Sequence, residues 1–154
     1  MKHLLWTKSS FHHGISGMTA DCFADTNLWI YAHLQAPGDS RCAQATRLVQ
    51  EDGLTISNQV LHEYYSVMLK HKSPDALIQR NIASMIEWCN IFCLDLATLE
   101  IAMNLRKRFH FSWRDSLIVA SALQSGCTRL YTEDLQHGQV IDGLIIANPF
   151  AVIN

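Results

Sequence analysis

The feature that most constrains this chain is the alternation of short apolar runs with longer segments of helical periodicity. The apolar runs have the length and composition of buried strands, and they cover residues 21–25, 54–57, 91–94, 128–132 and part of 143–150. The segments between them have helical spacing, and they cover residues 26–35, 40–51, 58–71, 73–89, 96–109 and 113–125. Short apolar strands separated by helices are typical of a parallel sheet covered on both faces. The sequence therefore predicts an α/β fold with a short-stranded, mostly parallel central sheet between two layers of helices.

Helix-capping residues stand at two of these boundaries. Pro37 and Gly38 break the chain, and Asp39 or Ser40 is then expected to cap the next helix. Asn58 is expected to cap the helix that follows the second strand.

The length of 154 residues suits one domain with a buried core. Residues 1–17 (MKHLLWTKSSFHHGISG) differ in character from the rest, and Met18 stands just before the first regular element. These 17 residues lack the continuous apolar core of a secretory signal. We expect residues 1–17 to be a poorly ordered leader or extension, and residues 18–154 to form a single domain.

Composition narrows the class of protein. Apolar residues make up 49% of the chain and charged residues 17%, and no apolar run approaches the roughly 20 residues of a membrane helix. Five cysteines are scattered without a CxxC pair, and Cys89 and Cys93 have no second Cys/His pair nearby to complete a zinc site. Reduced, mostly buried thiols in a cytoplasmic protein without membrane association are the expected state. The net charge of −2 means that any binding of nucleic acid must come from a local patch.

Two acids lie at the ends of predicted strands. Asp25 closes the first strand, and Asp134 follows the fourth strand by two residues. In open α/β sheets, sites form at the carboxyl ends of the strands, so both acids are expected at one edge of the sheet. Either acid alone is also explained as a turn or helix cap, because Asp is common at both.

Two further acids lie on predicted helices. Asp115 precedes Ile118, Val119 and Ala122 by three, four and seven residues, which places its carboxylate on the apolar face of that helix. An acid that points inward needs a cation or strong donors, although Ser112 and Asp115 also resemble a capping box. Glu63 lies at the border of an apolar arc. Alone it would be an ordinary surface residue, and it becomes a candidate site residue only as the fourth acid of the set.

Clustered carboxylates repel one another unless a cation neutralises them. Mg2+ prefers a few carboxylates, keeps several waters, and leaves coordination positions open for phosphate oxygens. Such a metal can activate water for attack at phosphorus. The four acids therefore predict hydrolysis of a phosphodiester or a phosphomonoester.

With these residues in place, the sequence resembles the PIN domain family, and within it the VapC-like toxin ribonucleases of toxin–antitoxin systems. The resemblance runs from about Asp21 to the end of the chain. It is carried, in this order and spacing, by ADTNLWIYA, SNQVLHEYYSVM, FSWRDSLIVASALQSGCTRLYTEDL and IIANPF.

The resemblance implies roles for individual residues. The family's four catalytic acids fall on Asp25, Glu63, Asp115 and Asp134, with Asp25 and Asp115 as the expected metal ligands. Two supporting positions also match. Asn27 is expected to orient the first acid, and Thr132 matches the hydroxyl of the family's Thr/Ser-x-Asp pattern. Glu133 is then expected to be a solvated neighbour.

The resemblance also implies cofactor, substrate and partners. The fold would be a three-layer PIN-like α/β/α sandwich, and the cofactor Mg2+, with Mn2+ as a substitute. The substrate would be RNA, with transfer RNA as the leading candidate and ribosomal or messenger RNA as alternatives. A small antitoxin protein and a homodimer are the implied partners.

One basic cluster is a candidate RNA contact. It consists of Arg106, Lys107, Arg108 and Arg114, the last of which stands beside Asp115. The alternative is a solvated helix end, where cations also favour the helix dipole.

Two other functions compete with the ribonuclease. A Mg2+-dependent phosphatase-type hydrolase typically needs a second Asp two residues after the first, and Asn27 occupies that position. A non-catalytic binding module with the PIN fold remains the other alternative, against which the four intact acids argue.

Overall fold

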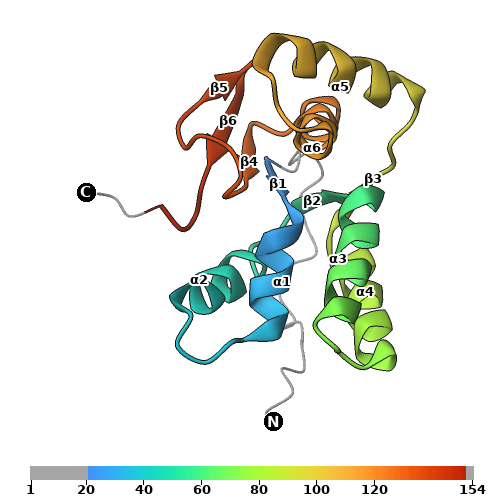
Figure 1. Ribbon diagram of the computed structural model, residues 1–154, viewed down its shortest axis with the longest axis vertical. Coiled ribbons are helices and arrows are strands. Elements are labelled where there is room, and N and C mark those ends of the chain that lie inside the picture. The colour runs from blue at the N-terminus through green and yellow to red at the C-terminus, as the bar shows by residue number, and fades with distance from the viewer. Residues whose placement is uncertain (1–20, 152–154) are drawn as a thin grey trace, which may run out of the picture.

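A six-stranded sheet runs through the centre of the computed structural model, which describes residues 21–151 (Figure 1). The strands are ordered β3-β2-β1-β4-β6-β5, and neighbours pair in parallel except for β5 and β6, which are antiparallel. Their bounds are β1 Cys22–Ala24, β2 Leu54–Ser57, β3 Asn90–Phe92, β4 Arg129–Tyr131, β5 Val140–Ile141 and β6 Leu144–Ala147.

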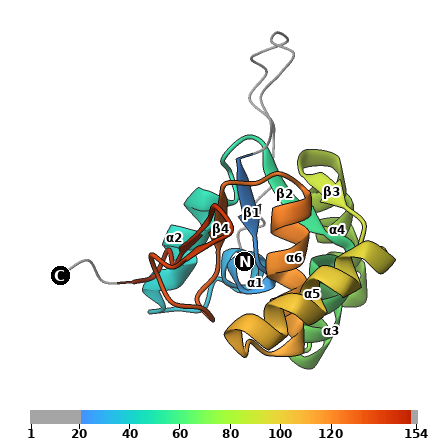
Figure 2. The same cartoon turned by 90° about the horizontal axis from the view of Figure 1, so that it is seen from above.

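Helices cover both faces of this sheet. Their bounds are α1 Thr26–Leu34, α2 Ser40–Leu48, α3 Asn58–Lys70, α4 Asp75–Trp88, α5 Leu96–Phe109 and α6 Trp113–Gln124. Helix α6 packs on β2 and β4 and carries α5 against it, while α1 packs on α2 and α3, and α3 on α4. Seen from above, α2 and α6 lie on opposite sides of β1 (Figure 2). The expected α/β architecture with a mostly parallel sheet is confirmed.

At two places the structure differs from what the sequence led us to expect. Ser57, and not Asn58, caps α3, because the Ser57 hydroxyl accepts from the Val60 N–H at 3.4 Å. The Asn58 side chain instead accepts from the Leu94 N–H at 3.1 Å and so ties α3 to the chain after β3. Strand β5 was not predicted, since its two residues are too short to show a periodicity.

The register of the central strands sets the position of the residues that follow them. Ala24 pairs with Tyr131, and Tyr131 pairs with Ala147, so β1, β4 and β6 end at the same edge. The next residues continue this alignment, because the Asp25 N–H donates to the Tyr131 carbonyl at 3.0 Å. Phe23 and Ala24 are fully buried, so the first polar residue beyond them has a rigid support.

Three further expectations concern the chain as a whole. The predicted leader, residues 1–17, lies outside the described residues, and the assignment of 18–154 to one domain stays a prediction. Within residues 21–151, no disulfide joins any of the five cysteines, of which only Cys42 and Cys127 are buried and Cys93 is exposed. Within residues 21–151, no helix has the length and apolar character needed to span a membrane.

Candidate active site

Asp25 is the most enclosed of the four predicted acids. It is the N-cap of α1, and its side chain is only 2% exposed. Its Oδ1 accepts from the Thr26 N–H at 2.6 Å, and its Oδ2 accepts from the Thr132 hydroxyl at 2.9 Å. The Asp25 carboxylate therefore both caps α1 and forms part of the candidate site, at the edge where the parallel strands end.

The other three acids come from three different elements. Glu63 projects from α3, Asp115 lies in the first turn of α6, and Asp134 follows β4 by three residues. Their side chains are 25%, 17% and 36% exposed, in that order, so all three lie at the border between core and solvent. The inward side of α6 is as predicted, since Ile118 is almost fully buried.

Local hydrogen bonds hold Glu63 and Asp115 in place. Glu63 accepts from the Thr26 hydroxyl at 2.8 Å and from Gln59 Nε2 at 2.9 Å. The Ser112 hydroxyl donates to Asp115 Oδ2 at 2.6 Å and accepts from the Asp115 N–H at 3.0 Å. Ser112 is thus the N-cap of α6, as its spacing from Asp115 suggested.

All four acids meet at one guanidinium, that of Arg114. Its Nη2 donates to Asp25 at 2.8 Å, and its Nε donates to Glu63 at 2.9 Å. Its Nη1 donates to Asp115 at 3.0 Å and to Asp134 at 3.2 Å. We call these five residues the acid cluster. The structure therefore brings the predicted acids together, with a cation at their centre.

Burial and the cation act in opposite directions on the carboxyl groups. Desolvation raises the pKa of Asp25, and the Arg114 guanidinium and the Thr26 N–H oppose that rise. Desolvation also raises the pKa of Asp134, again opposed by Arg114. The pKa of Arg114 itself is raised, because the attraction of Asp25 and Glu63 outweighs its own desolvation. Removing these charged groups from water costs free energy, and the ion pairs with Arg114 offset part of that desolvation cost.

The two supporting residues contact the acids in different ways. Thr132 connects two of them, because its hydroxyl donates to Asp25 and accepts from the Asp134 N–H at 3.2 Å. Asn27 Nδ2 donates to Glu133 at 3.2 Å and to Asp134 at 3.4 Å. The Asn27 side chain thus contacts Glu133 and Asp134, whereas the sequence led us to expect that Asn27 orients Asp25.

Glu133 is not the solvated neighbour that we expected. Its side chain is 20% exposed and accepts from the Tyr31 hydroxyl at 2.5 Å as well as from Asn27. Arg41 lies over the Tyr31 ring, 4.2 Å from its centroid, and donates to the Tyr31 hydroxyl at 2.7 Å. Glu133 therefore fastens the loop that carries Asp134 to α1 and α2.

The basic cluster separates into two parts. Arg106, Lys107 and Arg108 lie exposed in the last turn of α5, where Arg106 donates to the Phe111 carbonyl and Arg108 forms a two-pronged ion pair with Asp142 at 2.8 Å. Arg114 lies inside the acid cluster. RNA contact by these residues stays a prediction.

Sequence reasoning found the four acids but missed what holds them. Gln59 and Thr26 orient Glu63, and Arg114 joins the whole set, yet none was predicted in that role. Arg114 and Asp115 are adjacent in the sequence, but neighbouring residues of a helix point about 100° apart, so their adjacency did not predict this ion pair.

The acid cluster can be tested as a metal site by its donor chemistry. Four carboxylates supply the hard oxygen ligands that Mg2+ prefers. Gln59 adds a buried carbonyl oxygen that has no hydrogen-bond partner among the described residues. Within residues 21–151, no three His, Cys, Asp or Glu side chains are arranged to hold a metal ion, and the guanidinium lies between the carboxylates. The oxygen donors are of the chemical kind that suits a divalent cation, and in this structure they pair with Arg114.

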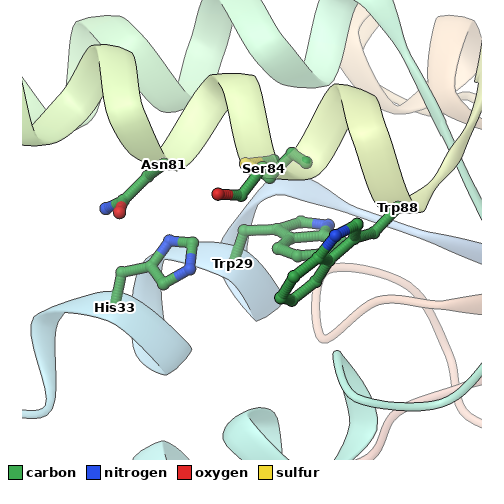
Figure 3. A pocket seen from close by; sticks show the side chains of 6 residues that line it. Trp29, His33, Asn81, Ser84 and Trp88 are labelled. Atoms are coloured by element: carbon green, nitrogen blue, oxygen red, sulfur yellow. The ribbon is translucent and has the colours of Figure 1, made fainter. Parts of the chain in front are cut away.

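Two hollows lie away from these acids. Trp29, His33, Asn81 and Trp88 are among the residues around a cavity of about 10 Å³ between α1 and α4, which has room for about one water molecule (Figure 3). A shallower hollow of about 430 Å³ lies between α3 and α4, beside Tyr65. Neither is lined by an acid, so the acid cluster remains the candidate site.

Solved structures with a similar fold include toxins of toxin–antitoxin systems. The Mycobacterium tuberculosis toxin VapC20, which cleaves the sarcin–ricin loop, has 21% identity and a TM-score of 0.61 over 73% of this chain and 89% of its own. A toxin–antitoxin complex from Klebsiella pneumoniae has 17% identity and a TM-score of 0.65, over 85% and 99% of the two chains. VapBC2 from Rickettsia felis, bound to a DNA fragment from its promoter, has 20% identity and a TM-score of 0.58, over 82% and 97%.

These similarities establish the fold, and the sequence itself establishes the family. No curated protein sequence matches this chain significantly. The family model of the PIN domain, however, matches residues 22–142, which span every strand from β1 to β5 and all four acids. The chain therefore belongs to the PIN domain family.

Proposed function

We propose that this protein is a metal-dependent endoribonuclease that acts in the cytoplasm as the toxin of a toxin–antitoxin pair. The observation that carries the proposal is the convergence of Asp25, Glu63, Asp115 and Asp134, from four separate elements, on one cation. A merely structural acid would not need three others around it. Membership of the PIN domain family and a fold shared with a toxin that cleaves the sarcin–ricin loop support the same function.

Each residue of the site has a defined task in this proposal. Asp25 and Asp115 would hold Mg2+, or Mn2+ in its place. The bound ion would make a water more acidic and neutralise charge on the phosphate. Glu63 and Asp134 would orient the attacking water by accepting its protons. Thr132 holds Asp25 and the Asp134 backbone in one arrangement, which keeps the acids in place before the substrate arrives.

The substrate and the partners follow from the same comparison. The substrate is RNA, with transfer RNA as the first candidate and ribosomal or messenger RNA as the alternatives. VapC20, which has a similar fold, cleaves the sarcin–ricin loop. The partner is a small antitoxin, since the similar folds from Klebsiella pneumoniae and Rickettsia felis are those of toxin–antitoxin complexes. A homodimer of this chain is also proposed.

The test is cleavage of total RNA by the purified protein. Asp25→Asn and Asp115→Asn keep the shape of each side chain but remove its charge, and each is expected to lower the cleavage rate at least about 100-fold. Chelation of divalent ions by EDTA should abolish cleavage in the wild type. Glu87→Gln, on the exposed side of α4, is the matched control and should cleave normally. Sequencing the fragment ends identifies the RNA target.

Two outcomes would contradict the proposal. Cleavage that persists in EDTA, or in both Asn variants, would show that the acid cluster does not perform the reaction. Turnover of p-nitrophenyl phosphate without any RNA cleavage would favour the phosphatase-type hydrolase instead.

A further inference from the structure

Arg114 forms hydrogen bonds with four carboxylates, although only one of them, that of Asp115, is its neighbour in the sequence. It is the second residue of α6, and its Nε, Nη1 and Nη2 all donate to carboxylates of the acid cluster. An arginine that only capped the helix or met solvent would not reach four acids from four elements. The guanidinium thus occupies the shared centre of the acid cluster, with nitrogen to oxygen distances of 2.8, 2.9, 3.0 and 3.2 Å.

A divalent cation and this guanidinium need the same oxygen atoms. Mg2+ binds oxygens at about 2.0–2.1 Å, whereas the guanidinium holds the carboxylates about 3 Å from its nitrogens. The carboxylate oxygens that surround the guanidinium are therefore too far apart to coordinate Mg2+ without moving. Two cations at the same centre would also repel each other strongly. Asp25, with a side chain 2% exposed, has no room to turn toward a second site.

Arg114 has a route out of the cluster. Its side chain is 33% exposed, and its backbone lies in the first turn of α6 at the surface of the sheet edge. Rotation of this long side chain frees the carboxylates without any change of backbone. Its carbonyl stays fixed meanwhile, because it accepts from Gln59 Nε2 at 3.3 Å.

We propose that Arg114 is the resident counter-ion of the acid cluster and competes with the divalent metal for it, so that Arg114 sets the metal concentration at which the site loads. This inference rests on the proposed function for the presence of a metal. Metal binding releases Arg114 toward solvent at the mouth of the site, where its guanidinium is available to a phosphate of the RNA. The same residue thereby keeps the acids together in one state and contacts substrate in the other.

The competition has a measurable consequence. The apparent affinity of a ligand falls by the fraction of molecules that are in the binding-competent state. Loss of the guanidinium removes the competing state, so metal affinity rises. The metal-free protein loses the cation that neutralises its acids at the same time, so its melting temperature falls.

The experiment is calorimetric titration of MnCl2 into the metal-free wild type, Arg114→Gln and Arg114→Lys. Arg114→Gln is expected to bind Mn2+ at least about tenfold more tightly than the wild type, and to melt several degrees lower until Mn2+ is added. Arg114→Lys keeps a charge but reaches fewer acids, so its affinity should fall between the two and its fold should be retained. Arg47→Gln, on the exposed side of α2, is the control and should match the wild type.

The outcomes separate this inference from the proposed function. Equal or weaker Mn2+ binding by both Arg114 variants overturns the competition, even if RNA cleavage requires metal. Absence of Mn2+ binding in every variant overturns it as well. Tighter binding by the Arg114 variants in a protein that cleaves no RNA supports the competition and refutes the ribonuclease.

Discussion

At the scale of single residues, Asp25 shows how one side chain serves both the fold and the site. One carboxylate oxygen caps α1 and the other accepts from Thr132, so the acid is already oriented by the surrounding structure. A helix cap that also faces a catalytic centre gains rigidity from the helix it begins. The dual role explains why the same sequence pattern fits both a plain cap and a metal ligand.

The sequence predicted that the four acids would converge, but it did not predict the residues that contact them, and the catalytic roles of the acids stay predictions. Asp115 was placed correctly because helical spacing to Ile118 and Val119 fixes the direction in which it points. The partners of Asn27 and Glu133 depend on how the loop after β4 folds back toward α1, which no local pattern encodes. Arg114 was grouped with its basic neighbours because charge alone does not tell which way a long side chain turns.

His33 is a buried titratable residue outside the acid cluster. Its Nδ1 lies 2.7 Å from the Tyr64 hydroxyl, which in turn accepts from Asn81 Nδ2 at 2.9 Å. The Tyr64 hydroxyl therefore links His33 of α1 to Asn81 of α4. Figure 3 shows His33 on α1 facing Asn81 on α4. Burial lowers the pKa of His33 to about 4.

This lowered pKa predicts an acid-sensitive packing of α1 against α4. A histidine whose pKa is depressed in the folded state contributes stability that is complete above about pH 6.5 and is lost as pH falls toward 4. We expect this residue alone to reduce the free energy of unfolding by roughly 3 kcal/mol across that window. Urea denaturation at several pH values should show a shallower decline for His33→Gln. Equal declines in the two proteins would contradict the assignment.

At the scale of elements, the start of α6 connects helix capping with the site. The Ser112 hydroxyl accepts from the Asp115 N–H, and it donates to the Asp115 carboxylate. Asp95 caps α5 in the same manner by accepting from the Thr98 N–H at 3.0 Å, without an acid of the cluster nearby on that helix. The Ser112 cap contacts an acid of the candidate site and the Asp95 cap does not, so the effects of losing each cap can be compared.

We predict different consequences for the loss of these two caps. Ser112→Ala and Asp95→Ala should each lower the free energy of unfolding by about 1 kcal/mol, the usual cost of a lost N-cap. Only Ser112→Ala should also slow RNA cleavage, by roughly tenfold, because Asp115 loses the donor that holds it. Urea denaturation and cleavage rates measure the two effects separately. A normal cleavage rate in Ser112→Ala would show that this hydrogen bond has no role in the site.

The elements themselves were largely predictable from the chain. The bounds of α5 agree with the predicted helix over residues 96–109, and His110, with a φ of 59°, ends this helix. The cap of α3 was predicted wrongly as Asn58, because Ser57 and Asn58 are both good caps and the contact of Asn58 with Leu94 is a tertiary one. Strand β5 exists through its pairing with β6, which is a non-local property.

At the scale of the whole molecule, the RNA substrate that we propose would have to approach an acidic site on a protein of net charge −2. The electrostatic attraction of RNA to this protein must then come from exposed cationic side chains. Three of them, Arg106, Lys107 and Arg108, lie in the last turn of α5. Arg108 is shared with Asp142, which weakens its field toward a ligand.

Salt dependence tests this surface. In the Asp115→Asn background, which we expect to bind RNA without cleaving it, Lys107→Ala should reduce the slope of log affinity against log salt by about 0.7, the value for one phosphate contact of a single strand. Arg47→Ala is the control, because α2 lies on the opposite side of β1 from α6 (Figure 2), which carries α5. An unchanged slope for Lys107→Ala would remove this cluster from the RNA interface.

The strand order also determines when the site comes into existence during synthesis. β1 is made first, yet it lies between β2 and β4, and Thr132, which binds Asp25, follows it by 107 residues. A growing chain therefore cannot assemble the acid cluster until β4 and the loop after it have left the ribosome. Until then, the nascent chain has no complete acid cluster, so the ribonuclease activity that we propose cannot begin before Asp134 has left the ribosome.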